Sequence, residues 1–95
     1  MTDLPPHITA DTWDPVGVLA EHYRHTWTIR GGLVLGGDWH WRLERLRPVP
    51  PGAAAYGVET VWEGYARPQE VARWLDRQAT AWRWWQQQAP HHHRP

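Results

Sequence analysis

Cysteine, serine, lysine, asparagine and phenylalanine are all missing from this chain of 95 residues. Without Ser and Cys, covalent catalysis through those two nucleophiles is excluded. Without Lys, Schiff-base chemistry and the lysine of a phosphate-binding loop are excluded too. Thiolate metal sites and disulfides are absent with the cysteines. Arginine supplies every fixed positive side-chain charge, and with frequent Ala, Gly, Pro and Trp this composition is typical of a GC-rich bacterial genome.

Long apolar runs and an excess of one charge are also missing. No segment approaches the roughly 20 apolar residues that span a bilayer, and residues 1–11 have neither the basic start nor the apolar run of a secretory signal. Ten arginines balance ten Asp and Glu residues, so the overall charge indicates neither a nucleic-acid footprint nor an acidic tail. We expect a soluble cytoplasmic protein with one domain, near the small end of what folds alone.

Two amphipathic helices are predicted, one near each end of the chain. Asp14 followed by Pro15 marks a helix start, because the Asp side chain accepts from free amides and Pro fits the first helical position. This helix should end near Arg24 or His25. A longer helix is predicted from Pro68 to about Gln88. The resulting division of the chain is a flexible arm at residues 1–11, one α+β domain at residues 12–88 and a disordered His- and Pro-rich tail at residues 89–95.

Between the helices, apolar and polar residues alternate in the manner of β-strands. The alternation covers residues 26–30, 39–44 and 56–64. Gly31–Gly32 and Gly36–Gly37 can supply the positive φ of tight hairpin turns, and the prolines between residues 48 and 51 predict a loop. The order predicts an α+β fold, in which a three- or four-stranded antiparallel sheet packs against the N-terminal helix and the longer C-terminal helix (α-β-β-β-α).

The chain holds nine tryptophans, and periodicity predicts where their rings point. Seven are expected in the core, namely Trp27, Trp39, Trp41 and Trp62 from strands and Trp74, Trp82 and Trp85 from the last helix. Tyr56, Val58 and Thr60 should face inward with Trp62. Trp13 is expected to pack back on its own helix. Trp84 falls on the other side of the last helix, among arginines.

No group of residues has the spacing that catalysis or a metal centre needs. His22 and His25 are three residues apart and could supply two ligands, whereas zinc usually takes three or four. Glu59 and Glu63 lie about 13 Å apart if both are in one strand, beyond the roughly 5–9.5 Å of paired glycosidase carboxylates. Cross-strand pairing with arginines is the simpler role for them. We therefore expect no enzyme, no cofactor and no metal.

The outer face of the last helix is the candidate partner-binding site. It carries Arg73, Arg77, Thr80, Trp84 and Gln88. An exposed Trp beside Arg is typical of interface hot spots, and residues 67–95 hold five Arg and two acids, net +3. The favoured hypothesis is a non-catalytic intracellular protein-interaction module that binds another protein or a second copy as a homodimer. The alternative is a nucleic-acid-binding module that uses the same arginines and the exposed indole for stacking.

Three weaker patterns remain. Tryptophans on an open sheet face could stack a flat ligand such as a sugar. "RLRPVPP" spaces Arg45, Pro48 and Pro51 as a polyproline ligand does. The α-β-β-β-α order, with "GYARPQEVARWL" entering the last helix, is similar to double-stranded RNA-binding domains, a family that places phosphate-binding lysines at this helix start. Here only Arg67 is close, so the similarity is one of topology.

Overall fold

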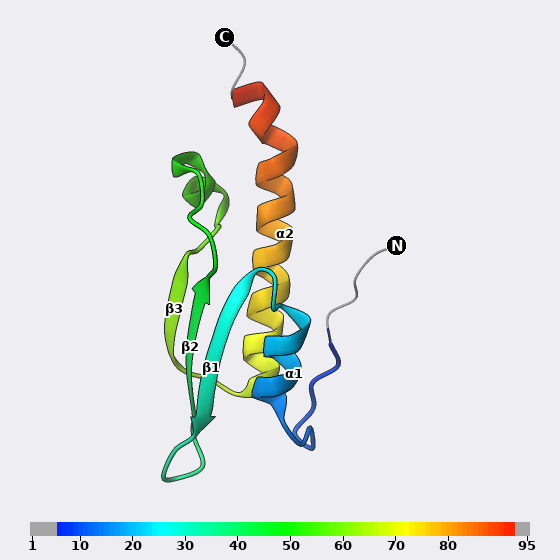
Figure 1. The fold of residues 1–95 in the computed structure, drawn as a ribbon, viewed down its shortest axis with the longest axis vertical. Helices are drawn as coiled ribbons and strands as arrows, with labels where there is room; N and C mark the ends of the chain where they lie inside the picture. The colour runs from blue at the N-terminus through cyan, green and yellow to red at the C-terminus, as the bar shows by residue number, and fades with distance from the viewer. Residues whose placement is uncertain (1–5, 93–95) are drawn as a thin grey trace.

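The computed structural model describes residues 6–92, with side chains described to residue 88. The elements are helix α1 (Pro15–His22), strands β1 (Trp27–Leu33) and β2 (Trp39–Arg45), the short 3-10 helix η1 (Pro51–Tyr56), strand β3 (Val61–Tyr65) and helix α2 (Pro68–His92). This order confirms the predicted α+β architecture with three strands (Figure 1). In the described part of the chain, no helix is long and apolar enough to cross a membrane.

One antiparallel sheet in the order β1-β2-β3 carries both helices on the same face. Leu19 of α1, Leu43 of β2 and Leu75 of α2 are fully buried in one core cluster, which places the helices side by side on the inner face. Figure 1 shows α2 continuing well past the sheet, with η1 beside this extension. A second, smaller cluster of Ala53, Val58 and Trp85 joins η1 to α2 there. The molecule is consequently long and narrow, 54 × 28 × 17 Å.

Helix α1 begins as predicted and ends early. Pro15 is its first residue, and Asp14 Oδ1 accepts a hydrogen bond of 3.0 Å from the N–H three residues on. The helix ends at His22, two or three residues before the expected end. The Tyr23 carbonyl accepts the Thr26 N–H at 2.9 Å, and this turn leads the chain into β1. Helix α2 is longer than predicted, since it continues past Gln88 to His92.

The described part of the expected N-terminal arm contributes to the core. Ile8 is buried in the main cluster. The Thr9 N–H donates to the Thr12 hydroxyl at 2.9 Å, and the Thr12 N–H donates to the Thr9 carbonyl at 3.2 Å. The arm therefore makes a short turn beside the core before α1 begins. Residues 1–5 and 93–95, which complete the predicted arm and tail, lie outside the described residues.

The prediction of a turn at Gly31–Gly32 is wrong, whereas the turn at Gly36–Gly37 is confirmed by φ values of 93° and 85°. Both earlier glycines lie inside β1. In the register of the sheet, Gly31 and Gly64 stand on either side of Trp41, which is fully buried. A Cβ on Gly31 would lie only 3.1 Å from the Trp41 ring. This glycine provides space for an indole rather than a change of chain direction.

The third strand is shorter than its sequence pattern predicts. Tyr56 lies in η1, Thr60 is exposed, and pairing with β2 begins only at Val61. The cause is Gly57, whose φ of 87° caps η1 and reverses the chain before the strand can start. Trp62 is partly buried against the main core, as predicted. Val58 is buried as well, but in the second cluster.

The seven tryptophans predicted to face the core are all buried or partly buried, whereas the prediction for Trp13 is wrong. Trp27, Trp41 and Trp85 are buried, and Trp39, Trp62, Trp74 and Trp82 are partly buried. Trp41 Nε1–H donates to the Ala66 carbonyl at 2.9 Å, which satisfies the polar atom of a fully buried indole. Trp13 is 96% exposed and does not pack on α1. The expectation that it folds back on the helix is therefore wrong.

Gly31→Ala should lower the free energy of unfolding by about 1–3 kcal/mol, because the new methyl group overpacks the site against the Trp41 ring. Gly32→Ala is the matched control in the next position of the same strand, since a Cβ there meets nothing within 4 Å. Its effect should stay within about 0.5 kcal/mol. Urea unfolding followed by tryptophan fluorescence measures both. Equal effects of the two substitutions would contradict this account of Gly31.

Candidate functional site

The five predicted partner-binding residues lie along one side of α2, and we call them the α2 stripe. They are Arg73, Arg77, Thr80, Trp84 and Gln88, with spacings of four, three, four and four residues. Gln88 is partly buried and the other four are exposed. The Trp84 side chain is 53% exposed, and one edge meets the Tyr56 ring at 4.9 Å between centroids. Trp84 is thus fixed on one side by η1 and open on the other.

The arginines of the α2 stripe form no ion pair within the part of the chain that the structure describes. Neither Arg73 nor Arg77 makes a hydrogen bond or salt bridge with any residue that the structure describes. Thr80 is engaged locally, since its hydroxyl donates to the Asp76 carbonyl at 3.2 Å and accepts from Arg83 Nη2 at 3.3 Å. The stripe therefore presents two solvated cations and an indole on a rigid helix.

Arg45, the last residue of β2, forms a second constellation that the sequence did not reveal. Its guanidinium carbon lies 4.5 Å from the Trp27 ring centroid and 5.7 Å from that of Trp82. Nε donates to the Glu59 carbonyl at 2.6 Å, and Nη2 donates to Gln78 Oε1 at 3.1 Å. Burial lowers the pKa of Arg45, because removal from water disfavours its charged form. The expected cross-strand pairing of Glu59 with an arginine through its carboxylate is replaced by this main-chain contact.

Gln78 holds Arg45 in place and is itself only 5% exposed. Its Oε1 also accepts the Glu59 N–H at 2.8 Å, and its Nε2 donates to the Gly57 carbonyl at 3.0 Å. A signal for this role existed in the sequence. Gln78 falls three residues after Leu75 and four before Trp82, so it is a polar residue within the apolar stripe of α2. Such a residue needs buried hydrogen-bond partners.

A groove of about 470 Å³ opens beside Arg45, between the end of β2, the proline segment and α2. We call it the Arg45 groove. Its lining includes His25, Arg45, Arg47, Pro48, Trp82 and Gln86. Because Trp27 and Trp82 flank the Arg45 guanidinium, it is not the free arginine of a polyproline ligand. Pro51 starts η1, so "RLRPVPP" does not form one continuous polyproline helix.

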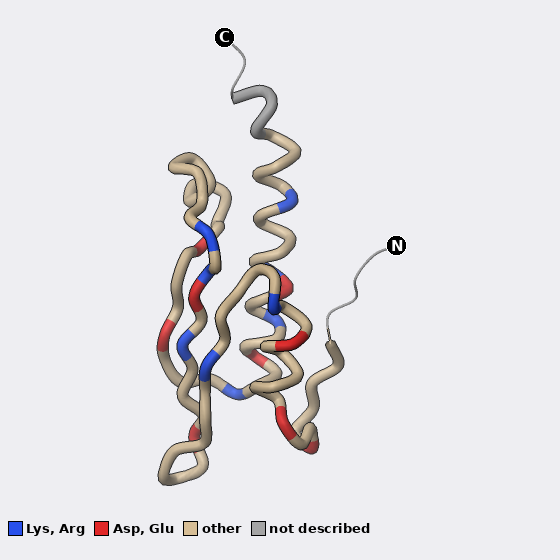
Figure 2. The backbone as a smooth tube through the Cα atoms, in the orientation of Figure 1, with Lys and Arg blue, Asp and Glu red and all other residues tan. Residues whose placement is uncertain are grey.

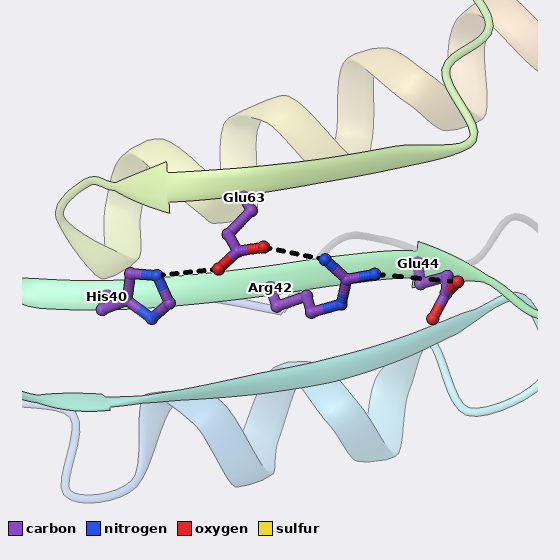
Figure 3. Close-up of polar contacts among 4 residues, drawn as sticks. All are labelled: His40, Arg42, Glu44 and Glu63. Atoms are coloured by element: carbon purple, nitrogen blue, oxygen red, sulfur yellow. Dashed lines mark hydrogen bonds and ion pairs between the residues drawn. The ribbon is translucent and has the colours of Figure 1, made fainter.

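The outer face of the sheet carries interleaved charges, visible along the strands in Figure 2. Glu63 of β3 is the centre of this network (Figure 3). Its two oxygens contact Arg42 Nη1 at 2.7 Å and His40 Nε2 at 3.3 Å, and Arg42 Nη2 lies 4.0 Å from Glu44. All four side chains are about half exposed. Such pairs contribute a few tenths of a kcal/mol each, so the network is a solvated sheet surface.

Three other kinds of site suggested by the sequence are a metal site, a stacking surface on the sheet and a phosphate-binding helix start. None of them is formed by the residues that the structure describes. Within the described residues, no three or more His, Cys, Asp or Glu side chains could share a metal ion. The four strand tryptophans belong to the core or pack against it, which leaves the open face of the sheet without an indole for stacking. At the start of α2, the Arg67 N–H donates to Glu70 at 3.0 Å, so the position resembling the phosphate-binding helix start carries a carboxylate beside its arginine.

Comparison with protein-family models, curated proteins and solved structures finds no match for this chain.

Gln78→Ala should lower the free energy of unfolding by about 1–3 kcal/mol, because it removes the partners of the Glu59 N–H, the Gly57 carbonyl and Arg45 Nη2. Gln87→Ala is the control, since Gln87 is exposed on the same helix and should change stability by less than about 0.5 kcal/mol. Thermal and urea unfolding measure both variants. A loss for Gln78→Ala no larger than that of the control would show that the network does not stabilise the fold.

Proposed function

We propose that this chain is a non-catalytic protein-interaction module that associates through the α2 stripe. The observation that carries the proposal is the 53% exposure of Trp84 on the same face of α2 as two arginines that make no ion pair with the described residues. A rigid, half-open indole with neighbouring arginines has the composition of an interface hot spot. Contact with a partner would remove apolar area of the ring from water while leaving the arginine charges paired or at the rim.

A second copy of the chain fits this stripe by its spacing. Positions 73 and 88 and positions 77 and 84 are symmetric about residues 80 and 81. Two antiparallel α2 helices related by a two-fold axis would set Arg77 against Trp84 of the second copy, and Arg73 against Gln88. Each Arg–Trp contact of this kind is worth about 0.5–2 kcal/mol. A parallel pair would instead place arginine against arginine, so the antiparallel arrangement is the one proposed.

Trp84→Ala should weaken association while leaving the fold nearly intact, with a stability loss of about 1 kcal/mol or less. Trp85→Ala, at a buried neighbouring position, should lose about 3–5 kcal/mol. Size-exclusion chromatography with light scattering across a concentration series measures association, and urea unfolding measures stability. We expect a wild-type dimer and a Trp84→Ala monomer at the same concentration.

Two results would contradict the proposal. If the wild-type chain stays monomeric up to millimolar concentration, the proposed self-association is contradicted. A loss of stability for Trp84→Ala as large as that for Trp85→Ala would show that the ring belongs to the monomer's own core. Arg77→Gln serves as a second interface variant, because the Arg77 side chain makes no hydrogen bond or ion pair with the described residues, so its replacement should weaken the dimer more than the fold.

Nucleic-acid binding by the same stripe is the second candidate. It is favoured by two arginines that form no ion pair with described residues and by an indole on the same helix face that could stack on a base. Phosphate binding should weaken steeply between low and moderate salt, whereas association through Trp84 should change only mildly. A gel-shift series with single- and double-stranded oligonucleotides at low salt tests this. We expect no retardation, because Glu70 and Asp76 interrupt the arginines along α2. Salt-sensitive retardation that Arg73→Gln and Arg77→Gln abolish would favour the nucleic-acid function instead.

A further inference from the structure

The Arg45 groove has a one-sided charge. Its titratable lining residues are His25, Arg45 and Arg47, and no carboxylate lines it. Arg45 forms no salt bridge with any described residue, because its partners are a main-chain carbonyl and the neutral Gln78 amide. Arg47 is exposed and makes no hydrogen bond within the described chain. Two uncompensated guanidinium groups therefore create a local positive potential in a recess of a chain that is neutral overall.

Arg45 is also preorganised to bind. Nε and Nη2 are held by hydrogen bonds, and Trp27 and Trp82 flank the planar group. Nη1 makes no hydrogen bond with the described residues, so its N–H groups remain to be donated. An arginine fixed in this way loses little side-chain entropy when it binds an anion. Its lowered pKa also indicates a partly water-excluded position, where pairing with an anion is stronger than in bulk water.

About half of the residues that line the groove are apolar, and they form one wall from Trp82 and the proline segment. Trp82 supplies a partly buried indole and Pro48 belongs to a proline segment with fixed backbone angles, while Gln86 adds a side-chain amide. A volume of about 470 Å³ lies within the range of small-molecule sites. Apolar walls with a few convergent polar groups are typical of such sites.

We infer that the Arg45 groove binds a small organic oxyanion, a phosphate or carboxylate carried on a flat apolar body. The anion meets Arg45 Nη1 and the Arg47 guanidinium, and the flat body lies against Trp82 and the proline wall. This binding site is separate from the α2 stripe and does not depend on the function proposed for it. It involves no covalent chemistry.

The test is a titration of the ¹⁵N-labelled full chain, followed by NMR at the Trp82 indole N–H and the Gln86 side-chain amide. AMP supplies a phosphate on a flat ring, indole-3-acetate supplies a carboxylate, and adenosine is the uncharged counterpart of AMP. We expect AMP, indole-3-acetate or both to shift the two reporter signals in a saturable way, and adenosine to bind at least about tenfold more weakly than AMP. Which anion binds more tightly identifies the headgroup.

Variants separate the groove from a general charge effect. Arg47→Gln removes an exposed groove arginine without touching the Arg45–Gln78 network, and it should weaken anion binding about tenfold. Arg73→Gln removes the same charge from the α2 stripe and should leave anion binding unchanged. Arg45→Gln should abolish binding, and the dispersion of its spectrum reports whether it folds; if it does not fold, Arg47→Gln decides the question.

Three results would overturn the inference. One is the absence of any shift at Trp82 and Gln86 with both anions at about millimolar concentration, the affinity range of the weakest specific sites. Another is binding of adenosine as tight as that of AMP, because the anion would then contribute nothing. The last is equal weakening by Arg47→Gln and Arg73→Gln, which would indicate nonspecific attraction to a cationic surface. A chain that does not dimerise but still binds the anion would contradict only the function proposed for the α2 stripe.

Discussion

A half-buried arginine and a buried glutamine connect the sheet of this protein to the part of α2 that extends beyond it. Arg45 ends β2, Gln78 lies in the middle of α2, and both bond to the main chain of Glu59 between them in space. Buried polar groups cost free energy unless they are hydrogen-bonded, so this network permits one position of the turn before β3. Trp27 and Trp82 shield it on two sides. The second core cluster, η1 and the Arg45 groove all depend on this connection, because each lies past the end of the sheet.

Features determined by local periodicity could be predicted from the sequence. The start of α1 at Asp14–Pro15 needs only neighbouring residues, and the direction of each ring on α2 follows from 3.6 residues per turn. That geometry predicts Trp82 and Trp85 toward the core and Trp84 away from it. In the structure Trp85 is buried, Trp82 is partly buried and Trp84 is exposed, as predicted. The tryptophans of the strands follow in the same way from a period of two.

The mistaken predictions share a different cause, since each depends on a residue distant in the sequence. A glycine pair can supply positive φ or free space, and only the register that sets Gly31 opposite Trp41 decides between them. Tyr56 alternates correctly for a strand, yet the left-handed Gly57 after it ends η1 and delays pairing. The Arg45 groove could not be predicted from the sequence for the same reason, because Arg45, Gln78 and the proline segment meet only in the folded chain. An unexpected Gln in an apolar helical stripe was the one local sign of it.

The two candidate surfaces use opposite sides of the same helical segment. Trp82 and Trp84 are two residues apart and therefore about 200° apart around α2, so occupation of the groove leaves the stripe accessible. One route for coupling between them runs through η1, because the proline segment that walls the groove leads directly into η1, and Tyr56 of η1 contacts the Trp84 ring. A ligand that shifted the proline segment would also shift Tyr56 against one edge of Trp84. By thermodynamic linkage, an anion that changes dimer affinity through this route must bind the dimer and the monomer with different affinities. Because a dimer has two grooves, the dimerisation constant at saturating anion changes by the square of the per-site affinity ratio. Dimerisation measured with and without AMP would therefore report the coupling free energy directly.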